Sequence, residues 1–142
     1  MPGKPTFRFV TAPSPGTLKR IITLYRAHGW WKPGDTPAGL RRLIRGSHCF
    51  AVAERGGEVV GMARAISDRA SDAYIQDVAV LESERGRGTG RRLVRAVLAR
   101  LRRDGIGWVA LIAQDDSHPF YRKLGFRRLG RALPMLSKGT HV

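Results

Sequence analysis

The residues from Arg85 to Arg91 have the types and the spacing of an anion-binding turn. They read Arg-Gly-Arg-Gly-Thr-Gly-Arg, between a β-rich run over 73–80 and a helical pattern that ends near Leu101. Glycine lets the backbone approach a ligand closely, and the first N–H groups of a helix have no partner within it. Arginine adds charge-assisted hydrogen bonds. The sequence therefore predicts a phosphate site, formed by Arg85, Gly86, Arg87, Gly88, Thr89, Gly90 and Arg91.

Two common phosphate-binding motifs do not fit this turn. A dinucleotide fingerprint needs Gly-x-Gly-x-x-Gly early in a βαβ unit, whereas Gly86, Gly88 and Gly90 have another spacing and lie in the second half of the chain. A P-loop ends in Gly-Lys-Ser or Gly-Lys-Thr, which is absent here. The pattern that fits is Arg-x-x-Gly-x-Gly, from Arg85 to Gly90. Alone, it is equally compatible with an ordinary strand-to-helix turn in an arginine-rich protein.

The composition is that of a basic protein with a hydrophobic core. The chain has 142 residues, which suits one domain, and 42% of them are hydrophobic. The formal net charge is +15, and 21 of the 26 basic residues are arginines. This charge favours nucleic acid, an anionic membrane or a phosphate-rich cofactor as partner. Arginines spread along a whole chain are, however, also ordinary solvated cations.

Cys49 is the only cysteine, which excludes an internal disulfide and a zinc site made of cysteines. It lies in a strand-like run, where a core position is expected. The first residues lack the apolar region of a signal peptide, and no apolar run is long enough to span a membrane. The sequence therefore predicts a soluble protein of the cytoplasm, with no metal and no membrane partner.

Hydrophobic periodicity predicts a mixed sheet with helices around the turn. The expected elements are a strand over 6–10, a helix from 17 to about 28, a helix from about 37, a hairpin of strands over 48–54 and 58–66, the central strand over 73–80, a helix over 91–101, a strand over 108–113 covered on both faces, a short helix capped by Ser117, and a last strand over 126–135. This order predicts an α/β protein, with residues 1–142 as one domain.

A second motif, Phe120–Phe126, follows the turn after one helix and one strand. The two motifs in this order resemble the GNAT superfamily of N-acetyltransferases. The turn resembles the pyrophosphate-binding loop of that family, and Phe120–Phe126 resembles the short helix and turn that close its coenzyme A site. The resemblance covers most of the chain, is sharpest over 74–126 and is weak before His48. It implies a GNAT-like mixed sheet flanked by helices, with acetyl-coenzyme A as co-substrate.

The resemblance also implies roles for particular residues. Val78, Ala79 and Val80 are similar to the strand whose backbone holds the pantetheine arm and the acyl carbonyl, and the Val80 N–H would stabilise the oxyanion. Tyr121 resembles the tyrosine that protonates the departing thiolate. Packing of the aromatic pair Phe120–Tyr121 is the structural alternative.

The general base is less well defined by the sequence. Asp77 lies on the central strand beside the expected thioester, and catalytic and structural roles are equally compatible with it. Asp115 and Asp116 are expected to be solvated, and His118 to begin a helix before its proline. The asparagine that the family often has after the fifth strand is not found, and Gln114 is the nearest amide. A water chain could replace a dedicated base.

The sequence predicts an N-acetyltransferase that acts on a primary amine of a small molecule or a protein. Trp30 and Trp31 could form an aromatic wall for that amine, although at least one is expected to pack in the core. Asp68 and Asp72 could attract an amine or neutralise arginines. Two other functions stay open, a basic nucleic-acid-binding module and a non-catalytic acyl-coenzyme A sensor. No specific nucleic-acid partner is expected, because no RNA-binding aromatic motif, zinc pattern or helix-turn-helix is found. A homodimer stays open.

Overall fold

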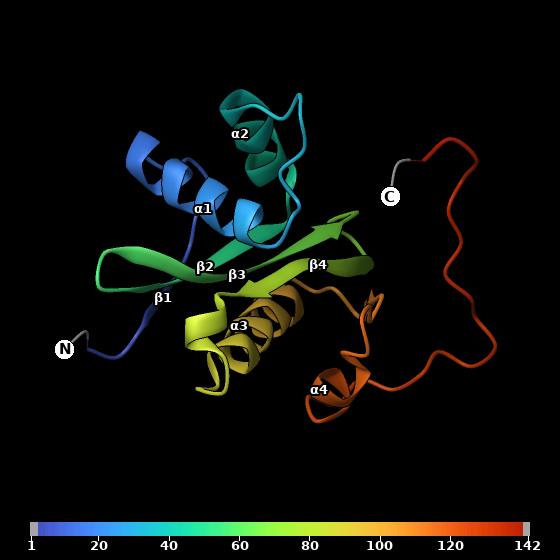
Figure 1. Ribbon diagram of the computed structural model, residues 1–142. Helices are drawn as coiled ribbons and strands as arrows, with labels where there is room; N and C mark the ends of the chain where they lie inside the picture. Colours follow the sequence, from blue (N-terminus) through green and yellow to red (C-terminus); the bar gives the residue numbers. More distant parts are fainter. Residues whose placement is uncertain (1–2, 141–142) are drawn as a thin grey trace. The chain divides into compact units, whose positions relative to one another are not determined.

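The computed structural model describes residues 3–140 of the chain. The chain forms two compact units, Met1–Leu111 and Ile112–Val142, and each is described by itself. The first unit contains a five-stranded sheet in the order β1-β2-β3-β4-β5 (Figure 1). Its strands are β1 (Thr6–Phe9), β2 (Cys49–Arg55), β3 (Glu58–Ser67), β4 (Asp72–Val80) and β5 (Trp108–Leu111). The mixed sheet with flanking helices confirms the α/β fold class expected from the sequence.

The first four strands form an antiparallel meander, and β4 pairs with β5 in parallel. The β2–β3 hairpin turns at Gly56 and Gly57, whose φ angles are 59° and 79°. A two-residue hairpin turn of this kind needs positive φ at both positions, which glycine adopts without steric cost. The parallel pairing of β4 with β5 requires a crossover, and the helix that follows β4 supplies it.

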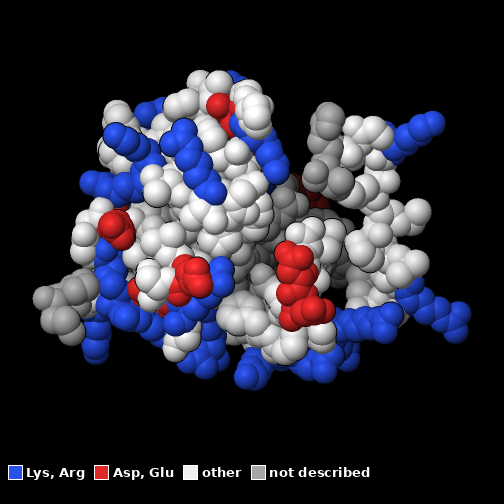
Figure 2. Space-filling view, in the orientation of Figure 1, with Lys and Arg blue, Asp and Glu red and all other residues white. Residues whose placement is uncertain are grey.

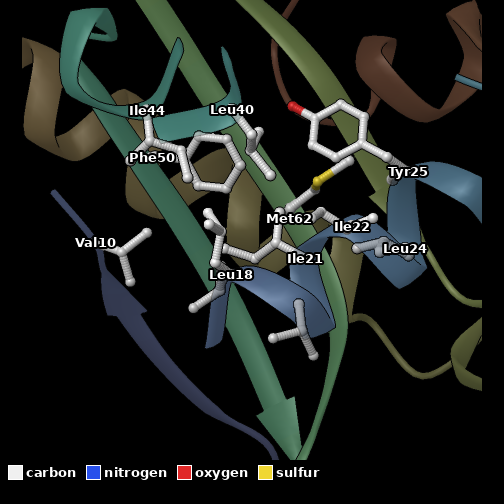
Figure 3. Close-up of a cluster of buried hydrophobic side chains, with 13 residues drawn as sticks. Val10, Leu18, Ile21, Ile22, Leu24, Tyr25, Leu40, Ile44, Phe50 and Met62 are labelled. Carbon is white, nitrogen blue, oxygen red and sulfur yellow. The ribbon is translucent and has the colours of Figure 1, made fainter. Parts of the chain in front are cut away.

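Two helices cover one face of the sheet, α1 (Pro15–Ala27) and α2 (Pro37–Gly46). Each begins with a proline after a capping side chain, since Ser14 accepts from the Thr17 N–H and Thr36 from the Gly39 N–H. Their apolar residues form a core with those of β2 and β3 (Figure 3). Fully buried members of this core are Ile21, Leu24, Ile44, Phe50, Val52 and Met62.

The helix α3 (Thr89–Arg103) packs on the sheet with the side chains Leu93, Val94, Val97 and Leu101, all fully buried. Because Met62 belongs to the core under α1 and α2, its neighbours Gly61 and Ala63 face the other side, toward α3. Five of the strand residues buried on this side are alanines, Ala51, Ala53, Ala63, Ala65 and Ala73, and Ile75, which pairs with Ala65, is a larger one. Small residues let the helix lie close to the sheet.

The second unit contains α4 (His118–Arg122) and, within residues 112–140, no strand. The strand predicted over 126–135 is therefore wrong. The Ala132 N–H bonds to the Leu129 carbonyl and Gly130 has a φ of 45°, so this segment turns instead of extending. Pro134 has no N–H to give to a ladder.

Two further expectations were wrong in detail. Ser117 makes no side-chain capping bond to α4 and has helical backbone angles. The strand predicted over 108–113 ends at Leu111, and its residues are half-buried or exposed, with Trp108 38% exposed. β5 pairs only with β4 within the described sheet, so one edge of β5 carries no strand there.

We expect Gly61→Ala to destabilise the protein and to loosen the start of α3. A Cβ at this position would lie 2.8 Å from Cδ1 of Leu93 and 3.3 Å from the backbone oxygen of Ala79. Leu93 is fully buried and has no room to turn away. Overpacking of this kind costs about 1–3 kcal/mol, measurable by urea denaturation.

The matched control is Gly46→Ala at the end of α2, where an added Cβ meets nothing within 4 Å. There alanine is neutral or stabilises by up to about 1 kcal/mol, because it favours the helix more than glycine does. Equal unfolding free energies for the two variants would show that α3 does not lie close on Gly61.

Candidate functional site

The turn between β4 and α3 leaves the first N–H groups of the helix without a capping side chain. After β4 the chain forms a short 3₁₀ helix, η1 (Glu82–Glu84), and then the glycine-rich turn (Figure 1). Gly86 and Gly88 have φ of 78° and 81°, and Gly88 caps α3 without a side chain. The first helical bond at this end runs from the Arg92 N–H to the Gly88 carbonyl. The N–H groups of residues 89–91 therefore have no partner inside the helix and carry the positive end of its dipole.

A buried carboxylate holds the turn in place from below. Glu84 is only 3% exposed and accepts hydrogen bonds from Nε and Nη2 of Arg55, at 3.0 and 2.8 Å. It also accepts a bond of 2.8 Å from the hydroxyl of Thr89. The bonds from Arg55 hold the pKa of Glu84 below its ordinary value, against the burial that would raise it. Glu84 thus joins the end of the β2–β3 hairpin to the first residue of α3.

Sequence reasoning did not find this role of Glu84. The only local signal is an acidic residue directly before an arginine-rich turn, and its main partner Arg55 lies 29 residues away. The structure also qualifies the prediction for Thr89, whose side chain is buried and bonded to Glu84. Only the backbone of Thr89 is left to contact a phosphate at the helix end.

The charged residues of the turn point to solvent. Arg85, Arg87 and Arg91 are exposed, and their guanidinium groups are free to approach an anion from outside. A Cβ built on Gly88 would lie 3.4 Å from Nη2 of Arg91, so this guanidinium lies directly beside the helix cap. The turn therefore combines backbone N–H groups with arginine side chains, and its role as a phosphate site stays a prediction.

The edge of β4 that faces β5 is paired along only part of its length. Its pairing with β5 ends at Ile75 and Leu111, whereas β4 itself continues to Val80. The Leu81 N–H donates to the Val60 carbonyl on β3, at 2.8 Å. Successive N–H groups of a strand point to opposite sides, so the Val80 N–H points away from β3, toward the open edge. Of the three residues predicted to hold an acyl thioester, Ala79 is buried, and Val78 and Val80 are half-buried.

A bulge occurs in β4 just before these residues. Met62 pairs with Ala79, but Arg64 pairs with Gln76, so two residues of β4 stand opposite Ala63. One of the two is Asp77, whose φ is 52°. The extra residue bends the strand and redirects the side chains around it.

The carboxylate of Asp77 has two partners on other elements. Its Oδ2 accepts a bond of 2.8 Å from the Tyr25 hydroxyl and one of 2.7 Å from Nε of Arg64. Burial, and then the nearby carboxylate, raise the pKa of Tyr25 above its ordinary value, so the hydroxyl stays protonated as a donor. Tyr25 lies at one end of the core cluster (Figure 3). Both hydrogen bonds end on Oδ2. Asp77 is therefore ion-paired with Arg64, and its bond from Tyr25 links the bulge to α1.

Tyr121 belongs to the second unit, and its ring packs against two neighbours there. Its centroid lies 4.9 Å from that of Phe120 and 5.9 Å from that of Phe126, both edge to face. Burial raises the pKa of its hydroxyl, which therefore stays protonated at neutral pH. The role of Tyr121 at a thioester stays a prediction.

The other side chains that the sequence singled out have local partners. Trp31 packs against the core under α1 and α2, while Trp30 is 38% exposed and stacks against His28. Asp68 accepts three backbone N–H bonds from residues 70–72, and these bonds lower the pKa of its carboxyl. Asp72 is exposed at the start of β4.

Neither a metal centre nor a membrane-spanning helix occurs within residues 3–140. Between residues 3 and 140, no three His, Cys, Asp or Glu side chains are grouped so that they could hold a metal ion. None of the helices in this range has the length and the apolar character needed to cross a bilayer.

A meander, a crossover helix with an open glycine-rich N-terminus and a half-paired central strand together define the acyl-coenzyme A N-acetyltransferase class. A model of the acetyltransferase (GNAT) family matches residues 18–126. The chain belongs to this family, a family of acyltransferases whose acetyl donor is acetyl-coenzyme A.

Curated relatives match over part of their length. The chain is 41% identical over 68 residues to a histone acetyltransferase of Glycine max, which covers 48% of this chain and 29% of the relative. It is 37% identical over 91 residues to the chloroplastic serotonin N-acetyltransferase 2 of Oryza sativa subsp. japonica, covering 61% of this chain and 46% of the relative. The chain thus spans less than half the length of these two relatives.

Solved structures match over nearly the whole chain. An acetyltransferase of Trypanosoma brucei superposes with a TM-score of 0.76 at 26% identity, covering 94% of this chain and 99% of that one. Glucosamine-6-phosphate N-acetyltransferase of Arabidopsis thaliana gives 0.75 at 17% identity, covering 97% and 100%. The second likeness shows the fold alone.

We expect Glu84→Gln to weaken the protein at neutral pH and much less in acid. The folded pKa of Glu84 is lowered, so its ion pair stabilises the fold above the unfolded value of about 4.3 and is lost as the pH falls through the folded value. Removing one partner of a buried pair costs about 3 kcal/mol. Urea denaturation at pH 7 and near pH 3.5 measures the difference.

Glu82→Gln is the control, because Glu82 lies in the same 3₁₀ turn but is exposed. Its unfolding free energy should stay within about 0.5 kcal/mol of the parent at both pH values. A constant cost of Glu84→Gln at both pH values would contradict an ionised Glu84 as the anchor of the turn.

Proposed function

We propose that this chain is an N-acetyltransferase that moves an acetyl group from acetyl-coenzyme A to a primary amine. In this proposal residues 1–142 act as one domain. The observation that carries it is the open N-terminus of α3, with its exposed arginines, after a central strand whose edge is unpaired from residue 76 onward. The family match over residues 18–126 supports the same activity.

The residues of the turn fit a pyrophosphate. Two glycines with positive φ keep side chains away from the helix end, and residues 89–91 present N–H groups without a helical partner. Arg85, Arg87 and Arg91 supply charge for the phosphates. The backbone of residues 78–80 would hold the pantetheine arm along the open edge of β4, in the manner of an added strand. Coenzyme A supplies the acetyl group as an activated thioester.

The chemistry asks little more of the protein. The Val80 N–H, which points to the open edge of β4, would stabilise negative charge on the carbonyl oxygen as the amine attacks. Tyr121 is the proposed acid for the departing thiolate. Asp77 is the proposed base, although its bonds to Tyr25 and Arg64 favour relay through a water over direct contact with the amine.

The acceptor is proposed as a class only. One relative is named for histones and another for serotonin, so both a protein amine and a small-molecule amine are retained. We propose the cytoplasm as the compartment, with a plastid as the alternative because the rice relative is described as chloroplastic. A non-catalytic acyl-coenzyme A sensor is the competing function, and turnover with a panel of amines, measured by release of free thiol, separates the two.

We expect Gly88→Glu to abolish binding of coenzyme A. Glutamate would place a side chain and a negative charge at the helix cap, beside Arg91. Isothermal titration calorimetry should show binding to the parent and none to this variant at the same concentrations. Gly105→Glu is the control, because Gly105 has a similar φ of 85° but lies at the other end of α3.

The control should unfold like Gly88→Glu, since both substitutions place an L side chain at positive φ, yet it should bind coenzyme A like the parent. Equal affinity of the Gly88→Glu variant and the parent for coenzyme A would show that the turn is not part of the binding site. Equal loss in both variants would assign the effect to backbone strain.

Tyr121→Phe should lower turnover while coenzyme A affinity stays close to that of the parent. The substitution keeps the ring that packs on Phe120 and Phe126 and removes only the hydroxyl. Loss of a general acid lowers kcat by about 100-fold. Steady-state release of free thiol gives kcat, and calorimetry gives the affinity.

Tyr74→Phe serves as the control, because Tyr74 is 47% exposed on β4 and is not assigned to the reaction. Its kcat should equal that of the parent. If Tyr121→Phe loses coenzyme A binding or unfolds, Tyr121 is a packing residue. If its kcat is unchanged, water protonates the thiolate.

A further inference from the structure

The outer side of α3 consists of arginine and alanine. At 100° per residue, the six buried side chains of the helix occupy one half of its circumference. The other half carries Arg91 of the turn and then Arg92, Arg95, Arg102 and Arg103, with Ala96 and Ala99 between them. We call Arg92, Arg95, Arg102 and Arg103 the arginine face. All four arginines are exposed, and α3 contains no acidic residue. Figure 2 shows basic side chains along the lower margin of the first unit, where Figure 1 draws α3 and the glycine-rich turn before it.

Contacts with β1 hold part of this surface in place. The guanidinium carbon of Arg92 lies 4.1 Å from the ring centroid of Phe7, and that of the neighbouring Arg100 lies 5.0 Å from that of Phe9. A guanidinium stacked on a ring loses less freedom when it binds an anion, because its position is already restricted. At the end of the helix, Asp104 pairs with Arg100 and, more loosely at 3.7 Å, with Arg103.

The composition of the arginine face distinguishes between three kinds of anionic partner: an acidic protein, an anionic membrane and the phosphate groups of a nucleic acid. A protein interface needs an apolar or aromatic centre, whereas the helix presents only alanines between these arginines and the rings of Phe7 and Phe9 lie beneath guanidinium groups. A helix that lies on a membrane buries its apolar side in lipid, but the apolar side of α3 is already buried against the sheet. Phosphate groups need only arginine forks and close approach, which this face provides.

We propose that the arginine face binds the phosphate backbone of double-stranded nucleic acid without reading its sequence. From Arg92 to Arg103 the helix rises about 16 Å, a length over which a duplex carries roughly ten charges. The face has no amide or carboxylate that would read adenine or cytosine in the major groove. This surface begins one residue after the coenzyme A turn, and the proposed binding of nucleic acid does not depend on acetyl transfer.

The test compares two triple variants of equal net charge. Arg95→Gln with Arg102→Gln and Arg103→Gln removes three charges from the arginine face. Arg20→Gln with Arg42→Gln and Arg45→Gln removes three exposed charges from α1 and α2, on the other side of the sheet. Binding of a fluorescent duplex of about 20 base pairs is followed by anisotropy between about 50 and 200 mM salt.

For the arginine-face variant, we expect the slope of log K against log salt to become less steep by about 3, because each phosphate contact contributes about 0.9. Over this salt range the parent should therefore lose about 40-fold more affinity than the variant. The α1 and α2 variant should keep the slope of the parent. Duplexes of different sequence should bind the parent alike, and both variants should bind coenzyme A as the parent does.

Three results would overturn the proposal. Equal slopes for the two variants would assign binding to net charge rather than to this face. A preference of more than about tenfold for one duplex sequence, guanine-rich duplexes included, would show that bases are read and would contradict binding to the backbone alone. Competition by polyglutamate as strong as by duplex of equal charge would identify an acidic protein as the partner.

Discussion

The buried carboxylate of Glu84 is the contact on which the arrangement of the site depends. It accepts hydrogen bonds from Arg55 at the end of β2 and from Thr89 at the start of α3. One carboxylate therefore connects the hairpin, the turn and the helix. An anion-binding turn in a chain of net charge +15 contains several arginines that repel one another. A negative charge beneath them offsets this repulsion and leaves the outer arginines free for a ligand. The hydrogen bonds from Arg55 keep that charge ionised although the carboxylate is buried.

The close approach of α3 to the sheet is the second constraint. A glycine and several alanines on this side of the sheet leave room for the leucine and valine side chains of the helix. The position of the helix N-terminus relative to the end of β4 therefore depends on the absence of a single Cβ at Gly61. The geometry of the proposed phosphate site and the packing of the core thus depend on the same few residues, as expected of a site made largely of backbone atoms.

Much of the first unit could be predicted from the sequence, because its elements have strong local signals. The hairpin at Gly56–Gly57 and the helix after the glycine-rich turn follow from glycine positions and apolar periodicity. The partners of Asp77 could not be predicted, since Tyr25 lies 52 residues away and a bulge changes the direction of the side chain. The strand over 126–135 was wrong because apolar residues outweighed Gly130 and Pro134, which turn the chain.

The single cysteine allows local opening of the sheet to be measured by thiol labelling. Cys49 begins β2, its thiol is buried, and burial raises its pKa to about 11. A thiolate is the reactive form, so in the folded protein this group is both shielded and protonated at neutral pH. Alkylation must wait until the strand separates from its neighbours. The rate of thiol labelling therefore reports how often the centre of the sheet opens, without a spectroscopic probe and without a substitution.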